Sequence, residues 1–288
     1  MKKNYFFSAV LAIAAAVACT EKGPVDFPIQ GDFTLYGENV AEQEVGVFVT
    51  SEGLPQSNLL YTGAKGEGAV ALTAKAEKAG FKQGNHTIYA YAPYAEGAEL
   101  TAVPVDYSKQ STVAFDPLAD DEILAGLMLS YNSTAQSVLY ATTEVTELSS
   151  AAITLPFAAV NPLTEVTVGE PGLEGTNANA QEGKKVTKIV VTCDKPIAYT
   201  GQTLDLTTGK LVGGTAVNSI EIAADMTVKK MGYVTAYGFT FKTCLTEEEV
   251  ATAKFKIEMV METGKTYAAE DKTPSYGGIY ALTLTEVE

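Results

Sequence analysis

Apolar and polar side chains alternate with a period of two along much of this chain. In the most regular case, Phe255, Ile257, Met259 and Met261 share one face, and most of the residues between them are charged. Successive side chains of a strand point to opposite faces of a sheet, so this spacing predicts a strand with one buried face. Similar alternation predicts strands at 45–49, 87–94, 137–143, 186–193, 203–206, 220–222, 277–285 and, as one long strand, 233–241.

Many short strands with turns between them, and almost no helical periodicity, predict an all-β fold built from β-sandwiches. The strand at 87–94 is expected to place Tyr89 and Tyr91 on one face, with Ile88 and Ala90 on the other.

Four segments depart from the simple strand pattern. Residues 71–80 (ALTAKAEKAG) are predicted to form a short helix that ends at its final glycine. The sequence TEEE at 246–249 has the spacing of a capping box, so one turn of helix is expected there. Gly209 in the turn TTGK is expected to join two strands as a hairpin. Residues 170–185 are polar and glycine-rich, and we expect a loop that is either exposed at a working end or disordered.

The start of the chain carries a different signal. Lys2 and Lys3 precede an apolar run at 5–17, and small residues then lead into Cys19. The run is shorter than the roughly 20 residues of a membrane-spanning helix, and the whole arrangement is typical of a secretory signal peptide. It resembles the lipobox of bacterial lipoproteins, in which the cysteine is acylated and becomes the N-terminus. The alternative is an ordinary signal with a cysteine nearby by chance.

These features predict a division of the chain. Residues 1–18 are expected to be a signal peptide, and residues 19–30, with two prolines, a lipidated tether. The composition changes near residue 150, where a new apolar run begins. We therefore predict an N-terminal β-sandwich at 31–150 and a C-terminal β-sandwich at 151–288.

The charge balance bears on partners. The chain has 35 acidic and 20 basic residues, a net charge of −15, and every basic residue is a lysine. Arginine forks are the usual means of recognising phosphates and bases, so no nucleic-acid partner is expected. No second apolar stretch reaches membrane length, so the lipid on Cys19 is expected to be the attachment to the outer membrane.

Two further cysteines leave two alternatives open. Cys193 and Cys244 of an exported protein are candidates for a disulfide. Cys193 is also in phase with Ile189 and Val191 on an apolar face, which fits a buried free thiol.

The sequence offers little for catalysis or metal binding. His86 is the single histidine and follows a Gly-Asn turn, so we expect an exposed polar residue. Asp120, Asp121 and Glu122 are adjacent but lack the spaced oxygen ligands of an EF-hand loop, so a solvated turn is expected. No GxSxG, phosphate-binding loop or HExxH motif is found. We expect no enzymatic activity, no cofactor and no metal site.

Several segments, taken in order, resemble one family. After the lipobox cysteine come the tyrosine-rich strand at 87–94, LPFAAVNPLTEVTV at 155–168, DLTTGKL at 205–211 and GGIYALTLT at 277–285. This succession, which covers nearly the whole mature chain, resembles the fimbrillin family, the type V pilins and pilin-like lipoproteins of Gram-negative anaerobes. It departs at 157–161 (FAAVN), where family members often carry a histidine.

The resemblance implies two tandem transthyretin-like β-sandwiches and export as a palmitoylated lipoprotein to the outer membrane. It implies a structural subunit (stalk, anchor or accessory pilin) of cell-surface fimbriae that serves adhesion, with other pilin subunits as partners. In stalk subunits proteolysis removes the first strand, and a strand of a neighbour fills the groove. If the terminal strand is the donor here, Tyr280, Leu282 and Leu284 would fill the pockets. The alternative is a plain last strand in its own sheet.

One departure bears on the role within a fimbria. Stalk members are typically cut after an arginine, and this chain has none. Either another protease acts, for example at a lysine, or the chain stays uncut as an anchor or accessory subunit. A second hypothesis is a surface glycan-binding lipoprotein, in which some of the 15 tyrosines would replace the absent tryptophan as sugar platforms.

Overall fold

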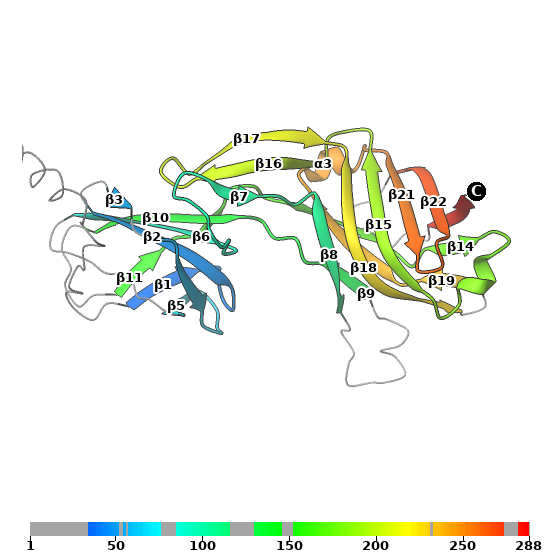
Figure 1. The fold of residues 1–288 in the computed structure, drawn as a ribbon, viewed down its shortest axis with the longest axis horizontal. Coiled ribbons are helices and arrows are strands. Elements are labelled where there is room, and N and C mark those ends of the chain that lie inside the picture. The colour runs from blue at the N-terminus through cyan, green and yellow to red at the C-terminus, as the bar shows by residue number, and fades with distance from the viewer. Residues whose placement is uncertain are drawn as a thin grey trace, which may run out of the picture.

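The computed structural model describes residues 34–51, 54–55, 57–75, 85–115, 130–145, 152–230, 233–273 and 282–287. These residues form an elongated molecule of two β-rich bodies arranged end to end (Figure 1). The predicted all-β class is confirmed.

The first body is a nine-stranded sheet. Its order is β11-β1-β5-β4-β2-β6-β10-β12, and β3 pairs with β2. The sheet curves until its ends approach, since the Thr143 hydroxyl on β10 donates to the carbonyl of Thr154 on β11 (3.4 Å). The strands are β1 (Thr34–Glu38), β2 (Glu44–Ser51), β3 (Leu54–Pro55), β4 (Leu59–Gly63), β5 (Ala69–Ala74), β6 (His86–Ala92), β10 (Leu139–Val145), β11 (Ala152–Leu155) and β12 (Ala158–Ala159).

The second body contains an eleven-stranded sheet of order β13-β20-β9-β8-β18-β15-β21-β22-β23-β14-β19. Its strands are β8 (Lys109–Phe115), β9 (Ser130–Ser133), β13 (Thr164–Val168), β14 (Gly172–Glu174), β15 (Lys185–Cys193), β18 (Ser219–Lys230), β19 (Val234–Ala236), β20 (Gly238–Thr243), β21 (Phe255–Met261), β22 (Thr266–Lys272) and β23 (Thr283–Val287). Two short helices accompany it, the 3-10 turn η1 (Ala178–Gln181) and α3 (Glu247–Val250).

Part of the second sheet closes on itself. β19 pairs with β14 on one side and with β18 on the other. The strands β18, β15, β21, β22, β23, β14 and β19 therefore form a ring, and a closed sheet has no free edges. A branch of four strands leaves the ring at β18. β8 pairs with residues 221–223 of β18, and β9, β20 and β13 follow in that order. Among the described residues, this path has one open end, β13, which pairs only with β20.

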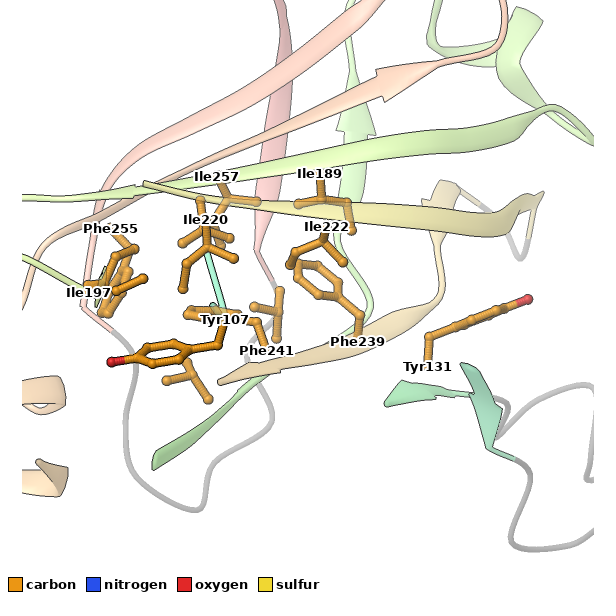
Figure 2. Packing of buried hydrophobic residues seen from close by; sticks show 14 of the residues in the cluster. Tyr107, Tyr131, Ile189, Ile197, Ile220, Ile222, Phe239, Phe241, Phe255 and Ile257 are labelled. Carbon is orange, nitrogen blue, oxygen red and sulfur yellow. The ribbon is translucent and has the colours of Figure 1, made fainter. Parts of the chain in front are cut away.

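Each body has its own hydrophobic core. One cluster includes Leu35 and Ile88. A larger one, part of which is drawn in Figure 2, includes Ile222 and Phe239. β6 contributes to both, because Ile88 faces the first core whereas Tyr91 is fully buried in the second. The alternation predicted for this strand is confirmed.

A hairpin arm connects the bodies. β16 (Ala198–Asp205) and β17 (Lys210–Val217) form a three-stranded sheet with β7 (Val103–Val105), and the hairpin reaches towards the first body (Figure 1). Its turn contains Gly209 with φ of 65°, as predicted, and a Cβ there would lie 2.7 Å from the ring of Tyr140 on β10. The Tyr140 hydroxyl donates to the carbonyl of Leu206 (2.8 Å). The hairpin tip is thereby fastened to the first sheet.

The chain passes between the bodies more than once. β8 and β9 precede residue 150 but belong to the second sheet, whereas β11 and β12 follow it and belong to the first. The sheets therefore do not separate at residue 150. The division into 31–150 and 151–288 stays a prediction about folding units.

The helix predicted at 71–80 is wrong for residues 71–74, which belong to strand β5. Val70 and Leu72 are buried on one face of that strand, which pairs with β1 and β4. The alanine, lysine and glutamate content favoured a helix, but pairing within the sheet outweighs local propensity. The remainder of that segment lies outside the described residues.

The single strand predicted at 233–241 is also wrong, because it breaks at Tyr237 into β19 and β20. The break lets β19 close the ring while β20 pairs with β13 and β9. The capping box is confirmed: the Thr246 hydroxyl accepts from the Glu249 amide (3.2 Å), and the Glu249 carboxylate accepts from the Thr246 amide (2.9 Å).

Candidate functional site

The proposed donor strand lies in its own sheet. β23 pairs antiparallel with β22 and parallel with β14, so both of its edges are occupied. Leu284 is fully buried and Leu282 is 6% exposed in the second core, while Tyr280 lies outside the described residues. The donor role stays a prediction, and it requires β23 to leave two partner strands.

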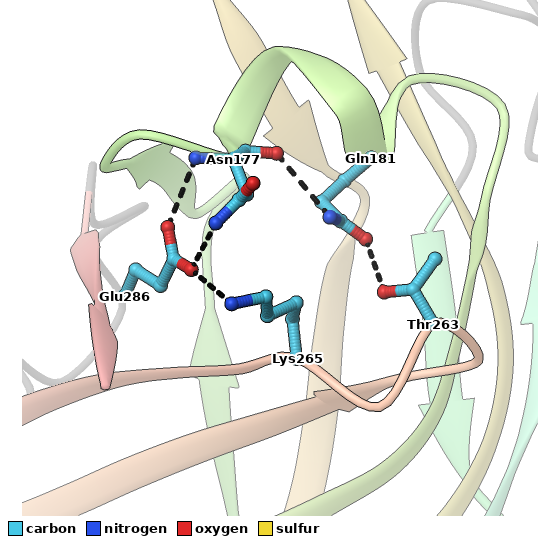
Figure 3. Close-up of polar contacts among 5 residues, drawn as sticks. All are labelled: Asn177, Gln181, Thr263, Lys265 and Glu286. Atoms are coloured by element: carbon cyan, nitrogen blue, oxygen red, sulfur yellow. Dashed lines mark hydrogen bonds and ion pairs between the residues drawn. The ribbon is translucent and has the colours of Figure 1, made fainter. Parts of the chain in front are cut away.

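A polar cluster holds β23 in place (Figure 3). The Glu286 carboxylate accepts hydrogen bonds from the main-chain amide (3.0 Å) and side-chain amide (2.6 Å) of Asn177, and it pairs with Lys265 (2.9 Å). Gln181 donates to the Asn177 carbonyl (3.2 Å) and accepts from Thr263 (2.7 Å). Lys265 first, and then the Asn177 donors, lower the pKa of the Glu286 carboxyl to about 2. We call these five residues the Glu286 cluster.

The segment predicted as a loop at 170–185 provides Asn177 and Gln181 of the Glu286 cluster. It contains β14 and η1, so the structure contradicts disorder there. Gly175 has φ of 133°, and a Cβ would lie 2.7 Å from the Cβ of Glu286. Only glycine combines this backbone conformation with so close an approach.

A groove with a volume of about 990 Å³ borders β13, at the open end of the second sheet. Residues 161–167 line it consecutively. Because consecutive side chains of a strand point to opposite faces, this continuous lining shows that the groove borders the strand edge and not one face. Leu211 of the hairpin and Val250 of α3 supply further apolar lining. We call this the β13 groove.

Two side-chain atoms of residues that line the β13 groove are buried and have no hydrogen-bond partner among the described residues. Asn161 is 9% exposed; its Oδ1 accepts from the Val138 amide (2.7 Å), but its Nδ2 donates to nothing there. The Oε1 of Gln202 on β16 is likewise buried without a donor. A buried polar atom without a partner costs about 1–3 kcal/mol. Asn161 and Gln202 both line the β13 groove, so two of its side chains have unused hydrogen-bonding capacity.

The β13 groove is acidic. Its lining includes Glu165 and Glu247, and no lysine contributes to it. The site therefore favours a ligand with positive charge over an anionic one.

Both internal cysteines are free thiols, so the structure does not contain the alternative disulfide. Cys193 is buried in the second core, and Cys244 lines the β13 groove. Burial raises the pKa of both thiols, that of Cys193 to about 11. A thiol with a raised pKa carries little thiolate, so neither is an activated nucleophile.

The remaining sequence candidates do not converge on a site. His86 is 3% exposed, which corrects the expected exposed turn: it begins β6 and shares a strand face with Ile88. Cys19 and the acidic cluster 120–122 lie outside the described residues. In the part of the chain that is described, no three metal-ligating side chains gather, and no helix is long and apolar enough to cross a membrane.

Sequence reasoning did not predict the β13 groove. An open edge depends on which strands pair, and alternation alone does not contain that information. The available signal was Pro162, two residues before β13, since proline beside a strand is typical of a sheet edge.

No family model and no curated protein matches this sequence. Similar solved structures include a candidate cell adhesion protein from Bacteroides ovatus, at 17% identity and a TM-score of 0.38, covering 89% of this chain and 96% of that chain. Another is a fimbrial protein from the same species, at 11% identity and a TM-score of 0.31, covering 90% of this chain and 50% of that chain. A fimbrial assembly protein from Parabacteroides distasonis has 13% identity and a TM-score of 0.28, covering 88% and 89%. Likenesses this distant assign no function to the chain.

Proposed function

We propose that this chain is a subunit of cell-surface fimbriae that serves adhesion and joins its neighbours by β-strand addition. The observation that carries the proposal is the open edge of β13, which pairs with β20 and has no second neighbour among the described strands. An open strand edge is the arrangement that strand addition requires. The first described strand, β1, is by contrast paired on both edges, parallel to β11 and antiparallel to β5, with Leu35 buried in the core. The order of sequence motifs that resembles the fimbrillins supports the same function.

Within such an assembly we assign the chain to the anchor or accessory subunits. The sequence has no arginine, and no lysine lies between Lys22 and Lys65. A protease specific for basic residues therefore has no site that removes β1 alone, because cleavage at Lys65 would also remove β2, β3 and β4. We expect β1 to stay in place, so that the first sheet keeps its own strand.

Lipidation of Cys19 completes this proposal. Several acyl chains on one cysteine make a stable membrane anchor, whereas a single chain binds only weakly. In this account the lipid holds the subunit at the outer membrane, and the β-rich bodies present surfaces to partner pilins.

The test is the apparent size of the protein in outer-membrane extract, run in detergent with and without boiling. We expect high-mass species that collapse on boiling, and a mature chain that carries acylated Cys19 and still contains residues 34–38. A single band of monomer mass before boiling would contradict membership of a strand-joined assembly. Absence of residues 34–38 would contradict the anchor or accessory assignment.

A surface glycan-binding lipoprotein is the second candidate, and one observation favours it. Tyr199 lines the β13 groove and is half-buried, so part of its ring is available to stack on a sugar. Retention on a polysaccharide gel, lost on Tyr199→Ala, would place this function first.

A further inference from the structure

We propose that the β13 groove is an acceptor for an extended, lysine-bearing strand of a different surface subunit, which adds to the open edge of β13. This deepens the proposed function and rests on it for the source of the strand. The chemistry of the groove itself determines the kind of ligand.

The first step of the argument is the strand edge. β13 pairs with β20 on one side, and among the described strands it has no neighbour on the other. An exposed edge presents unpaired main-chain amide and carbonyl groups, and another strand is the ligand that matches their spacing. Residues 161–167 give the groove a length suited to an extended segment rather than to a compact molecule.

The second step is the pair of unpartnered amide atoms. Asn161 Nδ2 needs an acceptor, and Gln202 Oε1 needs a donor. Neither atom has accessible surface in the free groove, so each side chain must turn towards an incoming strand, whose main chain carries both a carbonyl and an N–H in every residue.

The third step is the character of the walls. Leu163 and Leu211 are half-buried in the groove, and Leu245 and Val250 are buried beneath it. They offer apolar contacts to alternate side chains of an added strand. A strand of alternating apolar and polar residues therefore fits better than a uniformly polar one.

Charge selects the partner. Glu165 is exposed on the lining and no lysine contributes to it, so a lysine on the incoming strand is attracted. A second copy of this chain is disfavoured because each copy carries a net charge of −15. Its terminal strand is also unsuited, since β23 is paired on both edges and held by the Glu286 cluster.

The experiment uses the mature protein and a defined probe, the fluorescent peptide Thr-Val-Lys-Val-Thr-Val-Lys-Thr, with binding followed by fluorescence anisotropy. The control peptide has the same side chains but is methylated on its main-chain nitrogens, so it cannot pair as a strand. We expect saturable binding of the first peptide and at least roughly tenfold weaker binding of the second, since each lost hydrogen bond corresponds to about that factor.

Protein variants locate the site. Gln202→Met keeps the size of the side chain but removes the spare acceptor, and Glu165→Lys reverses the charge on the edge. Each is expected to weaken peptide binding roughly tenfold. Glu96→Lys makes the same charge change at an exposed turn that does not line the groove, and it is expected to leave binding unchanged. Unchanged thermal unfolding of the variants shows that each has folded.

The possible outcomes distinguish failure of the groove proposal from failure of the proposed fimbrial function. The acceptor proposal would be overturned if the peptide did not bind saturably or if both peptides bound equally. It would also be overturned if the peptide failed to bind while Gln202→Met abolished retention on a polysaccharide gel. If boiling-sensitive assemblies form equally well with Glu165→Lys, the groove proposal fails and the fimbrial function stands. If the peptide binds as expected but no assemblies exist in the outer membrane, the groove proposal holds and the proposed function fails.

Discussion

The β23 and β13 regions of the second sheet differ in how completely their strand edges and polar groups are paired. β23 is paired on both edges, its leucines are buried, and its Glu286 carboxylate has three donors around it. β13 is paired on one edge and borders a groove in which Asn161 and Gln202 retain unpartnered amide atoms. Natural proteins normally cover or close their sheet edges, so an open edge beside unpartnered amides indicates where another strand binds. We infer that β23 keeps both of its partner strands and that β13 takes a strand of another subunit as its second partner.

The largest expected effect concerns the closed region. Leu284→Ala removes a fully buried side chain from the second core, and it is expected to lower the free energy of unfolding by about 2–5 kcal/mol. Thr285→Ala, at the exposed neighbouring position of β23, should change it by no more than about 0.5 kcal/mol. Denaturant unfolding measures both, and equal effects would show that β23 is not seated in its own core.

The glycine beside Glu286 provides the next test. Gly175→Ala introduces a Cβ 2.7 Å from the Cβ of Glu286 at φ of 133°, and should cost about 1–3 kcal/mol of stability. Gly183→Ala is the control, because its φ is also positive (73°) but nothing lies within 4 Å of the new Cβ. A smaller loss of about 1 kcal/mol is expected there from backbone strain alone. Identical losses in thermal or denaturant unfolding would contradict the close approach of β14 and β23.

A smaller effect is expected at the edge of the β13 groove. Thr246→Ala removes the capping hydroxyl of α3, which accepts from the Glu249 amide, and should cost about 1 kcal/mol. Denaturant unfolding again provides the measurement. Thr252→Ser, which keeps a hydroxyl just beyond α3, should have little effect. No loss for Thr246→Ala would mean that the cap does not stabilise the wall of the groove.

The most specific expected effect is that of Glu286→Gln on the way stability depends on pH. The pKa of Glu286 is lowered from its ordinary 4.5 to about 2, so its ionised form stabilises the folded state above pH 4.5. This contribution is lost as the pH falls from about 4.5 towards 2. Glu286→Gln should therefore be less stable than the wild type near pH 7, and the difference should shrink over that window. A difference that is constant with pH would contradict the ionised cluster.

The sequence predicted the parts of the structure that depend on local pattern. The alternation of Phe255, Ile257, Met259 and Met261 specified a buried strand face, and Thr246 specified a helix cap. It failed where pairing decides the outcome. Residues 71–74 favour a helix by composition, yet β1 and β4 recruit them into a sheet.

The candidate site was less accessible to sequence reasoning. The sequence identified Leu282 and Leu284 as apolar side chains of a terminal strand. The strands among which they pack are determined by the closure of the ring through β19. The β13 groove combines Asn161, Glu165, Gln202 and Val250, which are brought together only by the fold. No spacing along the chain relates them.

The central claim is that β13 is open in the isolated subunit and covered in the assembly. Amide hydrogen exchange of residues 163–168 and 283–287 in the free protein and in the assembled form tests it most directly. We expect the β13 amides that face away from β20 to exchange fast in the free protein and to become protected on assembly, with β23 protected in both states. Protection of β13 that does not change on assembly, together with a change in β23, would contradict the account and identify the terminal strand as the one that moves.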